Sequence, residues 1–157
     1  MEVESEANDS DIFSGCGNGV LDVSISRGIT ADSWDASRGD RWIDICLDDE
    51  DLEAISLVIF RVATGKPYNG DDNILKLRNY DRQLFARIAP EFPMLGRINY
   101  IYADAYFTAE EVKNLRDECV RLKLATKDSA ADLGLRKLIY SCDEAIKVGF
   151  CLGLCCD

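Results

Sequence analysis

Carboxylates are the most concentrated reactive groups in this 157-residue sequence. Hard oxygen ligands of this kind suit magnesium, manganese or calcium, although the Asp-x-Asp-x-Asn-Gly spacing of a calcium loop is absent. Carboxylates are also favoured at the positive end of a helix dipole. The run therefore leaves three interpretations open: a solvated helix start, a surface that faces a partner, or a divalent-metal site. Its members are Asp44, Asp48, Asp49, Glu50, Asp51 and Glu53.

The sequence has seven cysteines and no histidine. Without histidine there is no Ser-His-Asp catalysis and no His-ligated zinc, and only Lys or Arg could activate a cysteine. The four cysteines nearest the C-terminus could offer thiolates to a metal, but they lack the paired C-x2–4-C spacing of zinc sites. These four are Cys142, Cys151, Cys155 and Cys156. We therefore expect no catalytic residue, no metal ligand and no cofactor.

The acidic excess is confined to the first third of the chain. Residues 1–53 hold fifteen acids and three bases, a net charge of −12, whereas residues 54–157 carry a net charge of +1. A field of this sign repels nucleic acid and anionic membranes, because binding to phosphates needs clustered Lys and Arg. It speeds encounter with a basic protein. A simple contribution to solubility is the other interpretation.

The N-terminus shows no targeting signal. Residues 1–11 are polar and acidic and lack the basic and apolar regions of a signal peptide, so we expect a mobile tail. No stretch approaches the run of about 18 apolar residues that reads as a membrane span. We therefore expect a cytoplasmic protein whose cysteines are thiols that act as small buried hydrophobic groups.

Two strands and a helix are predicted to position the carboxylates. Alternating apolar residues predict strands at 20–26 and 42–47. Asp48 or Asp49 can then cap a helix whose apolar side chains recur at steps of three and four, and Gly65 ends it. The apolar segment 150–156 is too short for another helix. We expect it to form a strand beside 42–47 and to pack against the helices.

The second half of the chain is predicted to be helical in short pieces. We expect one helix at 79–89 and another that starts near Pro93. Thr108 and Glu111 have the spacing of a capping box, and the last helix should begin at 128 or 129 and end at Gly149. The whole therefore predicts a single α+β domain over residues 12–157, mostly helical, with about five helices packed on a small two- or three-stranded sheet.

One region resembles a known type of protein. The pattern that carries the likeness runs from Pro90-Glu-Phe-Pro-Met-Leu95 through Phe107-Thr-Ala-Glu-Glu-Val112 to Leu115-Arg-Asp-Glu-Cys119, and it continues at residues 138–142, Ala145 and Gly149. It is similar to a pattern in small bacterial proteins of the toxin-immunity type. The resemblance implies a single-domain inhibitor that binds a toxin and does no chemistry. It assigns no functional residue.

The leading hypothesis is therefore a non-enzymatic binding protein, an immunity-type inhibitor of a basic toxin or of a similar cationic partner. Aromatic residues near the acidic run could anchor such a partner. The alternatives are a divalent-metal-dependent hydrolase or transferase that uses the carboxylates of residues 44–51, and a structural subunit of a larger assembly. The expected partner-binding residues are Trp34, Asp35, Asp40, Trp42, Asp44, Asp48, Asp49, Glu50, Asp51 and Tyr68.

Overall fold

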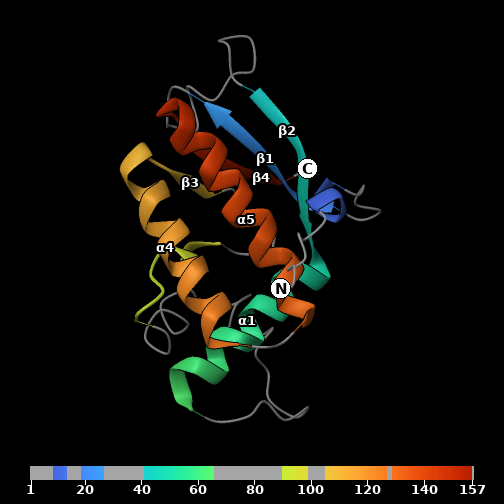
Figure 1. Ribbon diagram of the computed structural model, residues 1–157, viewed down its shortest axis with the longest axis vertical. Helices are drawn as coiled ribbons and strands as arrows, with labels where there is room; N and C mark the ends of the chain where they lie inside the picture. The colour runs from blue at the N-terminus through green and yellow to red at the C-terminus, as the bar shows by residue number, and fades with distance from the viewer. Residues whose placement is uncertain are drawn as a thin grey trace, which may run out of the picture.

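The computed structural model describes residues 9–13, 19–26, 41–65, 90–98, 105–126 and 129–156. These residues form four strands, three α-helices and two short 3-10 helices (Figure 1). In chain order they are η1 (Asp9–Phe13), β1 (Gly19–Ser26), β2 (Arg41–Asp48), α1 (Asp49–Thr64), η4 (Leu95–Arg97), β3 (Ala105–Phe107), α4 (Ala109–Ala125), α5 (Ser129–Val148) and β4 (Cys151–Cys156).

The strands form one sheet in the order β2-β1-β4-β3, and every pair is antiparallel. The α+β class is confirmed, but the expected sheet of two or three strands is too small. Sequence analysis missed β3 because its three residues, Ala105–Phe107, are too few to show an alternating pattern. The helix expected to start near Pro93 is also wrong in part, because Leu95–Arg97 forms only a single 3-10 turn.

The helices α4 and α5 lie side by side in front of the sheet, and α1 crosses near their lower ends, where it packs mainly against α5 (Figure 1). Three α-helices are present in the described parts of the chain, rather than about five. The helix expected at 79–89 lies outside the described residues. The helices α1, α4 and α5 confirm the three long amphipathic patterns. Both ends of α1 and of α5, and the start of α4, lie within one or two residues of those expected.

The core lies between the sheet and the helices. Leu21, Val23 and Ile25 on β1 alternate toward it and are at most 1% exposed. Leu152 and Leu154 on β4 are fully buried beside them. The prediction that segment 150–156 packs as a strand is confirmed. Its expected neighbour is wrong, because β4 lies between β1 and β3 and does not touch the β2 ladder.

Local capping signals set the helix ends. The Asp48 side chain accepts a hydrogen bond from the Asp51 N–H, and the Thr108 side chain accepts one from the Glu111 N–H. The Glu111 carboxylate in turn accepts a hydrogen bond from the Thr108 N–H, so the predicted capping box is confirmed. Gly149 ends α5 at a φ of 73°, a left-handed conformation that favours glycine.

The short helix η1 is joined to α5. Arg136 donates two hydrogen bonds to the Asp11 carboxylate, at 2.9 and 2.7 Å, and a third to Asp132. Ile12 is 1% exposed, and the Phe13 ring meets the edge of Tyr140. The sequence predicts a tail over residues 1–11 and a domain that starts at residue 12, and η1 spans this boundary.

Candidate functional site

An acidic depression opens at the start of α1. We use this name for the hollow of about 470 Å³ whose wall is made of four acidic and three apolar residues. The acids come from the N-cap and the first turns of α1, where the helix dipole favours negative charge. The apolar floor comes from α1 and from α5. The lining residues are Asp48, Glu50, Asp51, Glu53, Ala54, Leu57 and Leu133.

A buried ion pair lies beneath the acidic depression. The Lys137 Nζ donates to the Asp51 Oδ2 at 2.5 Å, and the two side chains are only 4% and 5% exposed. Lys137 also donates to the backbone carbonyl of Cys46 at 2.9 Å, which ties α5 to β2. Burial raises the pKa of the Asp51 carboxyl, while the hydrogen bonds from Lys137 and from the Asp48 N–H oppose this. The Asp51 carboxylate is therefore used inside the fold, where it pairs with Lys137.

Three other acids of this region are exposed and are not neutralised by a described base. Asp44, Glu50 and Glu53 are exposed, and within the described residues none of them has an ion-pair partner. Most acids on α4 and α5 differ from these three residues, because each of them forms an ion pair with a nearby base. Those pairs are Glu110–Lys113, Glu111–Arg97, Asp132 with Lys123 and Arg136, Asp143–Arg116 and Glu144–Lys147.

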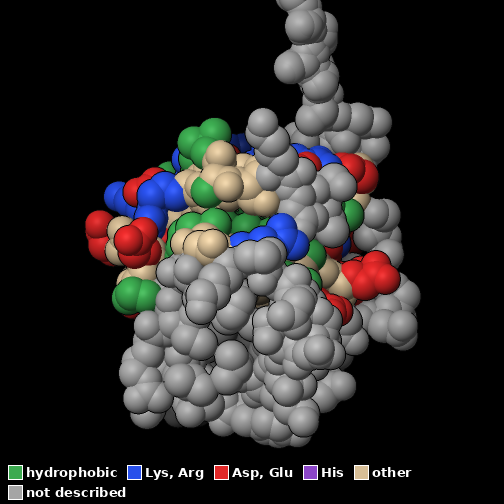
Figure 2. All heavy atoms as spheres, turned by 90° about the horizontal axis from the view of Figure 1, so that it is seen from below, with side chains coloured by type: hydrophobic (Ala, Val, Ile, Leu, Met, Phe, Trp, Pro, Cys, Tyr) green, Lys and Arg blue, Asp and Glu red, His purple; other side chains and the backbone are tan. Residues whose placement is uncertain are grey.

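Among the described residues, negative charge is not continuous over the face seen from below. In the view from below, acidic side chains lie at two opposite margins of the face, with hydrophobic side chains visible between them (Figure 2). At one margin, basic side chains lie directly beside the acids. The described acids on this face therefore form local clusters rather than a uniformly negative surface.

The structure brings together only part of the expected binding set. Asp48, Glu50 and Asp51 line the acidic depression, and Asp44 lies on the neighbouring strand β2. Trp34, Asp35, Asp40 and Tyr68 lie outside the described residues, as do the side chains of Trp42 and Asp49.

Sequence reasoning missed Lys137 and the apolar floor. Lys137 lies on the polar side of the α5 pattern, and its partner Asp51 is 86 positions away. Leu57 belongs to the apolar side of α1, so its residue type and spacing predict core packing rather than a surface position. In the folded chain Leu57 and Leu133 are half-buried rather than fully buried, a difference that leucine residues at helical spacing do not reveal in the sequence.

The described cysteines divide into two kinds. Cys46 is disulfide-bonded, which corrects the expectation that all seven cysteines are thiols. Cys119, Cys142, Cys151 and Cys155 are thiols. Burial raises the pKa of Cys119 and Cys142 well above the ordinary thiol value, so these two are poor nucleophiles at neutral pH.

No metal centre is formed by the described side chains. Among them, no three His, Cys, Asp or Glu residues converge as a metal site requires. Cys142 is buried on α5, whereas Cys151 pairs with Ser26 on the sheet face that points away from the core residue Ile25. The cysteines near the C-terminus are therefore divided between two faces of the sheet.

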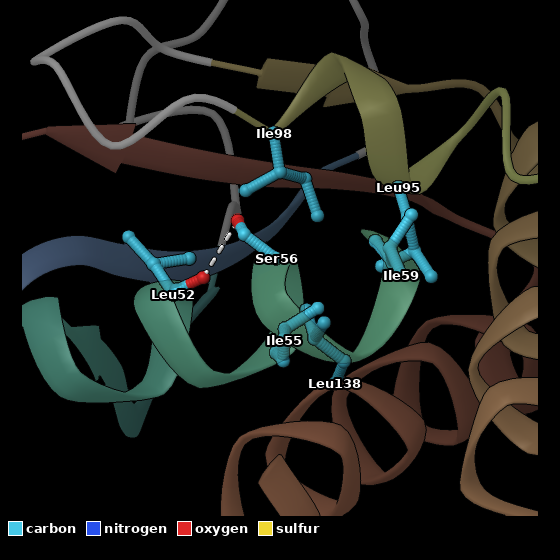
Figure 3. Close-up of a pocket in the computed structure, with 7 residues that line it drawn as sticks. All are labelled: Leu52, Ile55, Ser56, Ile59, Leu95, Ile98 and Leu138. Atoms are coloured by element: carbon cyan, nitrogen blue, oxygen red, sulfur yellow. Dashed lines mark hydrogen bonds between the residues drawn. The ribbon is translucent and has the colours of Figure 1, made fainter. Parts of the chain in front are cut away.

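A second cavity lies between α1, α5 and the residues of η4. It has room for about one water molecule at about 10 Å³. Its lining is apolar except for Ser56, whose hydroxyl donates to the Leu52 carbonyl at 2.9 Å (Figure 3). The lining holds no charged group, and its one hydroxyl is hydrogen-bonded to the helix backbone, so we assign the cavity to core packing. Its other lining residues are Ile55, Ile59, Leu95, Ile98 and Leu138.

Comparison of the chain with protein-family models, curated proteins and solved structures finds no match. None of the helices in the described segments combines the length and apolar character that crossing a membrane would require. The acidic depression and the chemistry of its wall are therefore the basis on which a function can be argued.

Proposed function

We propose that this protein is a non-enzymatic binding protein that recognises a basic protein partner through the acidic depression. An immunity-type inhibitor of a cationic toxin is the form of this function that the sequence resemblance favours. We infer a binding role because the acids of α1 line a hollow.

The observation that carries the proposal is the difference between two sets of acids. Those on α4 and α5 are mostly neutralised by bases of the same fold, as in Glu111–Arg97. Glu50 and Glu53 are exposed, have no ion-pair partner in the described structure, and line one hollow. An arrangement of this kind leaves uncompensated negative charge that an incoming cation can neutralise.

The apolar floor adds specificity to this attraction. Lys and Arg side chains carry a long apolar stem and a charged tip. In the acidic depression the stem can pack on Leu57 and Leu133 while the tip meets the carboxylates of Glu50 and Glu53. Burial of the stem favours a side chain of a folded partner over a simple ion, because a metal ion gains nothing from apolar contact.

The test compares two variants of equal charge as bait in an extract of the native host. Glu50→Gln/Glu53→Gln removes the free acids of the acidic depression. Glu110→Gln/Asp117→Asn removes two exposed acids of α4 and is the matched control. We expect the unmodified protein and the control to retain one basic protein at low salt. The depression variant should lose it.

Salt provides the second criterion. Raising the ionic strength from about 0.1 M to 1 M shortens the screening length from about 10 Å to about 3 Å, so an electrostatic complex should dissociate. Recovery of no protein at low salt, or equal recovery by all three baits, would contradict the proposal.

A further inference from the structure

The Cys46 disulfide lies next to the network that shapes the acidic depression. The backbone carbonyl of Cys46 accepts the hydrogen bond from Lys137, and Lys137 holds the Asp51 carboxylate. Asp51 accepts a hydrogen bond from the Asp48 N–H at 3.1 Å and donates its own N–H to Asp48 at 2.9 Å. The cross-linked residue is therefore connected through one lysine to two acids that line the acidic depression.

The strand that carries Cys46 is irregularly paired. β2 is at one edge of the described sheet. Its register on β1 shifts between Asp22 and Val23, where the paired residue changes from Cys46 to Ile43. Asp44 and Ile45 therefore have no Cα partner in the ladder. Irregular edge pairing of this kind opens more readily than regular central pairing.

An opening of β2 near Cys46 would affect the Lys137–Asp51 ion pair. Both side chains are almost completely buried. Lys137 therefore depends on Asp51 and on the Cys46 carbonyl as acceptors, whereas Asp51 depends on Lys137 and on the Asp48 N–H as donors. When the end of β2 is displaced, Lys137 loses the Cys46 carbonyl as a hydrogen-bond acceptor, and water reaches the Lys137–Asp51 pair. The capping box of Asp48 and Asp51 shares the same carboxylate oxygen, Asp51 Oδ2, and would loosen with it.

We propose that the Cys46 disulfide is a redox switch for the acidic depression, closed and competent to bind when oxidised and loosened when reduced. Reduction by a dithiol transfers two electrons and two protons to the protein disulfide, which becomes two thiols. The dithiol becomes a cyclic disulfide. Cys46 is half-buried. The binding part of this inference rests on the proposed function, whereas the structural part does not.

The first experiment measures hydrogen–deuterium exchange of the full chain with and without dithiothreitol. Non-reducing peptide mapping identifies the cysteine joined to Cys46 and confirms its reduction. We expect reduction to speed exchange over residues 46–53 by about tenfold or more, with residues 109–125 of α4 unchanged. The same region should exchange rapidly in Cys46→Ser without reductant, whereas Cys151→Ser, which changes a thiol of β4, should respond to dithiothreitol as the unmodified protein does.

Three results would overturn the switch: unchanged exchange over residues 46–53 after complete reduction, an equal increase in α4, or a Cys46→Ser variant that behaves like the oxidised protein. An equal increase in α4 would mean that the disulfide stabilises the whole fold. Should Cys46→Ser not fold, a dithiothreitol titration of the unmodified chain decides the same question.

The second experiment measures binding of an octa-arginine peptide to the oxidised and reduced forms. A loss of affinity of about fivefold or more on reduction supports control of binding. Equal affinity, alongside the change in exchange, would overturn that control. Failure of the peptide to bind either form counts against the proposed function, while the exchange result still decides whether the switch exists.

Discussion

Lys137 on α5 and Asp51 on α1 form a buried ion pair, with the Lys137 Nζ 2.5 Å from the Asp51 Oδ2. The two helices approach closely because Gly134 faces α1. A Cβ atom at position 134 would lie 3.0 Å from the Ile55 side chain and 3.1 Å from the Asp51 Cβ. The pair also joins β2 through the Cys46 carbonyl. Three elements therefore meet at one lysine beneath the acidic depression.

Removing Lys137 should strongly destabilise the fold. We expect Lys137→Met to lower the free energy of unfolding by about 3–5 kcal/mol at pH 7, because Asp51 is left buried without its cation. Urea denaturation measures the loss. The control Lys147→Met removes an exposed pair with Glu144 and should cost at most about 1 kcal/mol. Similar losses of unfolding free energy in the two variants would show that burial does not strengthen the contribution of the Lys137–Asp51 pair.

Glu118 should give the stability a specific pH dependence. Its side chain accepts hydrogen bonds from the Met94 and Leu95 N–H groups. Burial raises its pKa above the ordinary 4.5, more strongly than these bonds and the charges of Arg121 and Arg97 lower it. The folded state therefore binds the proton more tightly than the unfolded state. The contribution of Glu118 to stability is fully present below pH 4.5 and is lost as the pH rises through the folded pKa.

The comparison of the unmodified protein with Glu118→Gln isolates this contribution. We expect the difference between their unfolding free energies, unmodified minus variant, to fall as the pH is raised from 4 to 7. Urea denaturation at four pH values measures it. A difference that grows with pH would contradict the raised pKa.

The C-terminal strand should be essential for stability. Deletion of residues 150–157 removes β4 from between β1 and β3, so we expect an insoluble or strongly destabilised protein. Within the full chain, Leu152→Ala should cost about 2–5 kcal/mol, because Leu152 is fully buried. Val148→Ala is the control, since Val148 is 48% exposed and should change stability by less than about 0.5 kcal/mol. A truncated protein with an unchanged melting temperature would refute the structural role.

The capping box of α4 should make a smaller, local contribution. Thr108→Ala removes the acceptor of the Glu111 N–H and should lower the free energy of unfolding by about 1 kcal/mol. Thr108→Ser keeps the hydroxyl and should retain most of the stability. Thermal unfolding of the three proteins provides the measurement. The box would have no energetic role if Ala and Ser substitutions had the same effect.

Features that depend on neighbouring residues could be predicted from the sequence. Asp48 and Thr108 cap helices because their side chains reach N–H groups three positions ahead. Gly149 ends α5 because its backbone adopts a positive φ. The α+β class followed from alternating and helical periods that each lie within one segment. The short strand β3 escaped prediction because pairing with β4, rather than any local pattern, makes it a strand.

The candidate site needed the tertiary structure. The sequence by itself determined that the acids cluster between positions 44 and 53, and that no histidine accompanies them. Only the folded chain decided that Asp51 is neutralised by Lys137, 86 positions away, while Glu50 and Glu53 stay exposed beside an apolar floor. It also joined Asp11 to Arg136 across 125 positions. The physical reason is that charge compensation acts through space, so the packing of α1 against α5 selects which acids remain available to a partner.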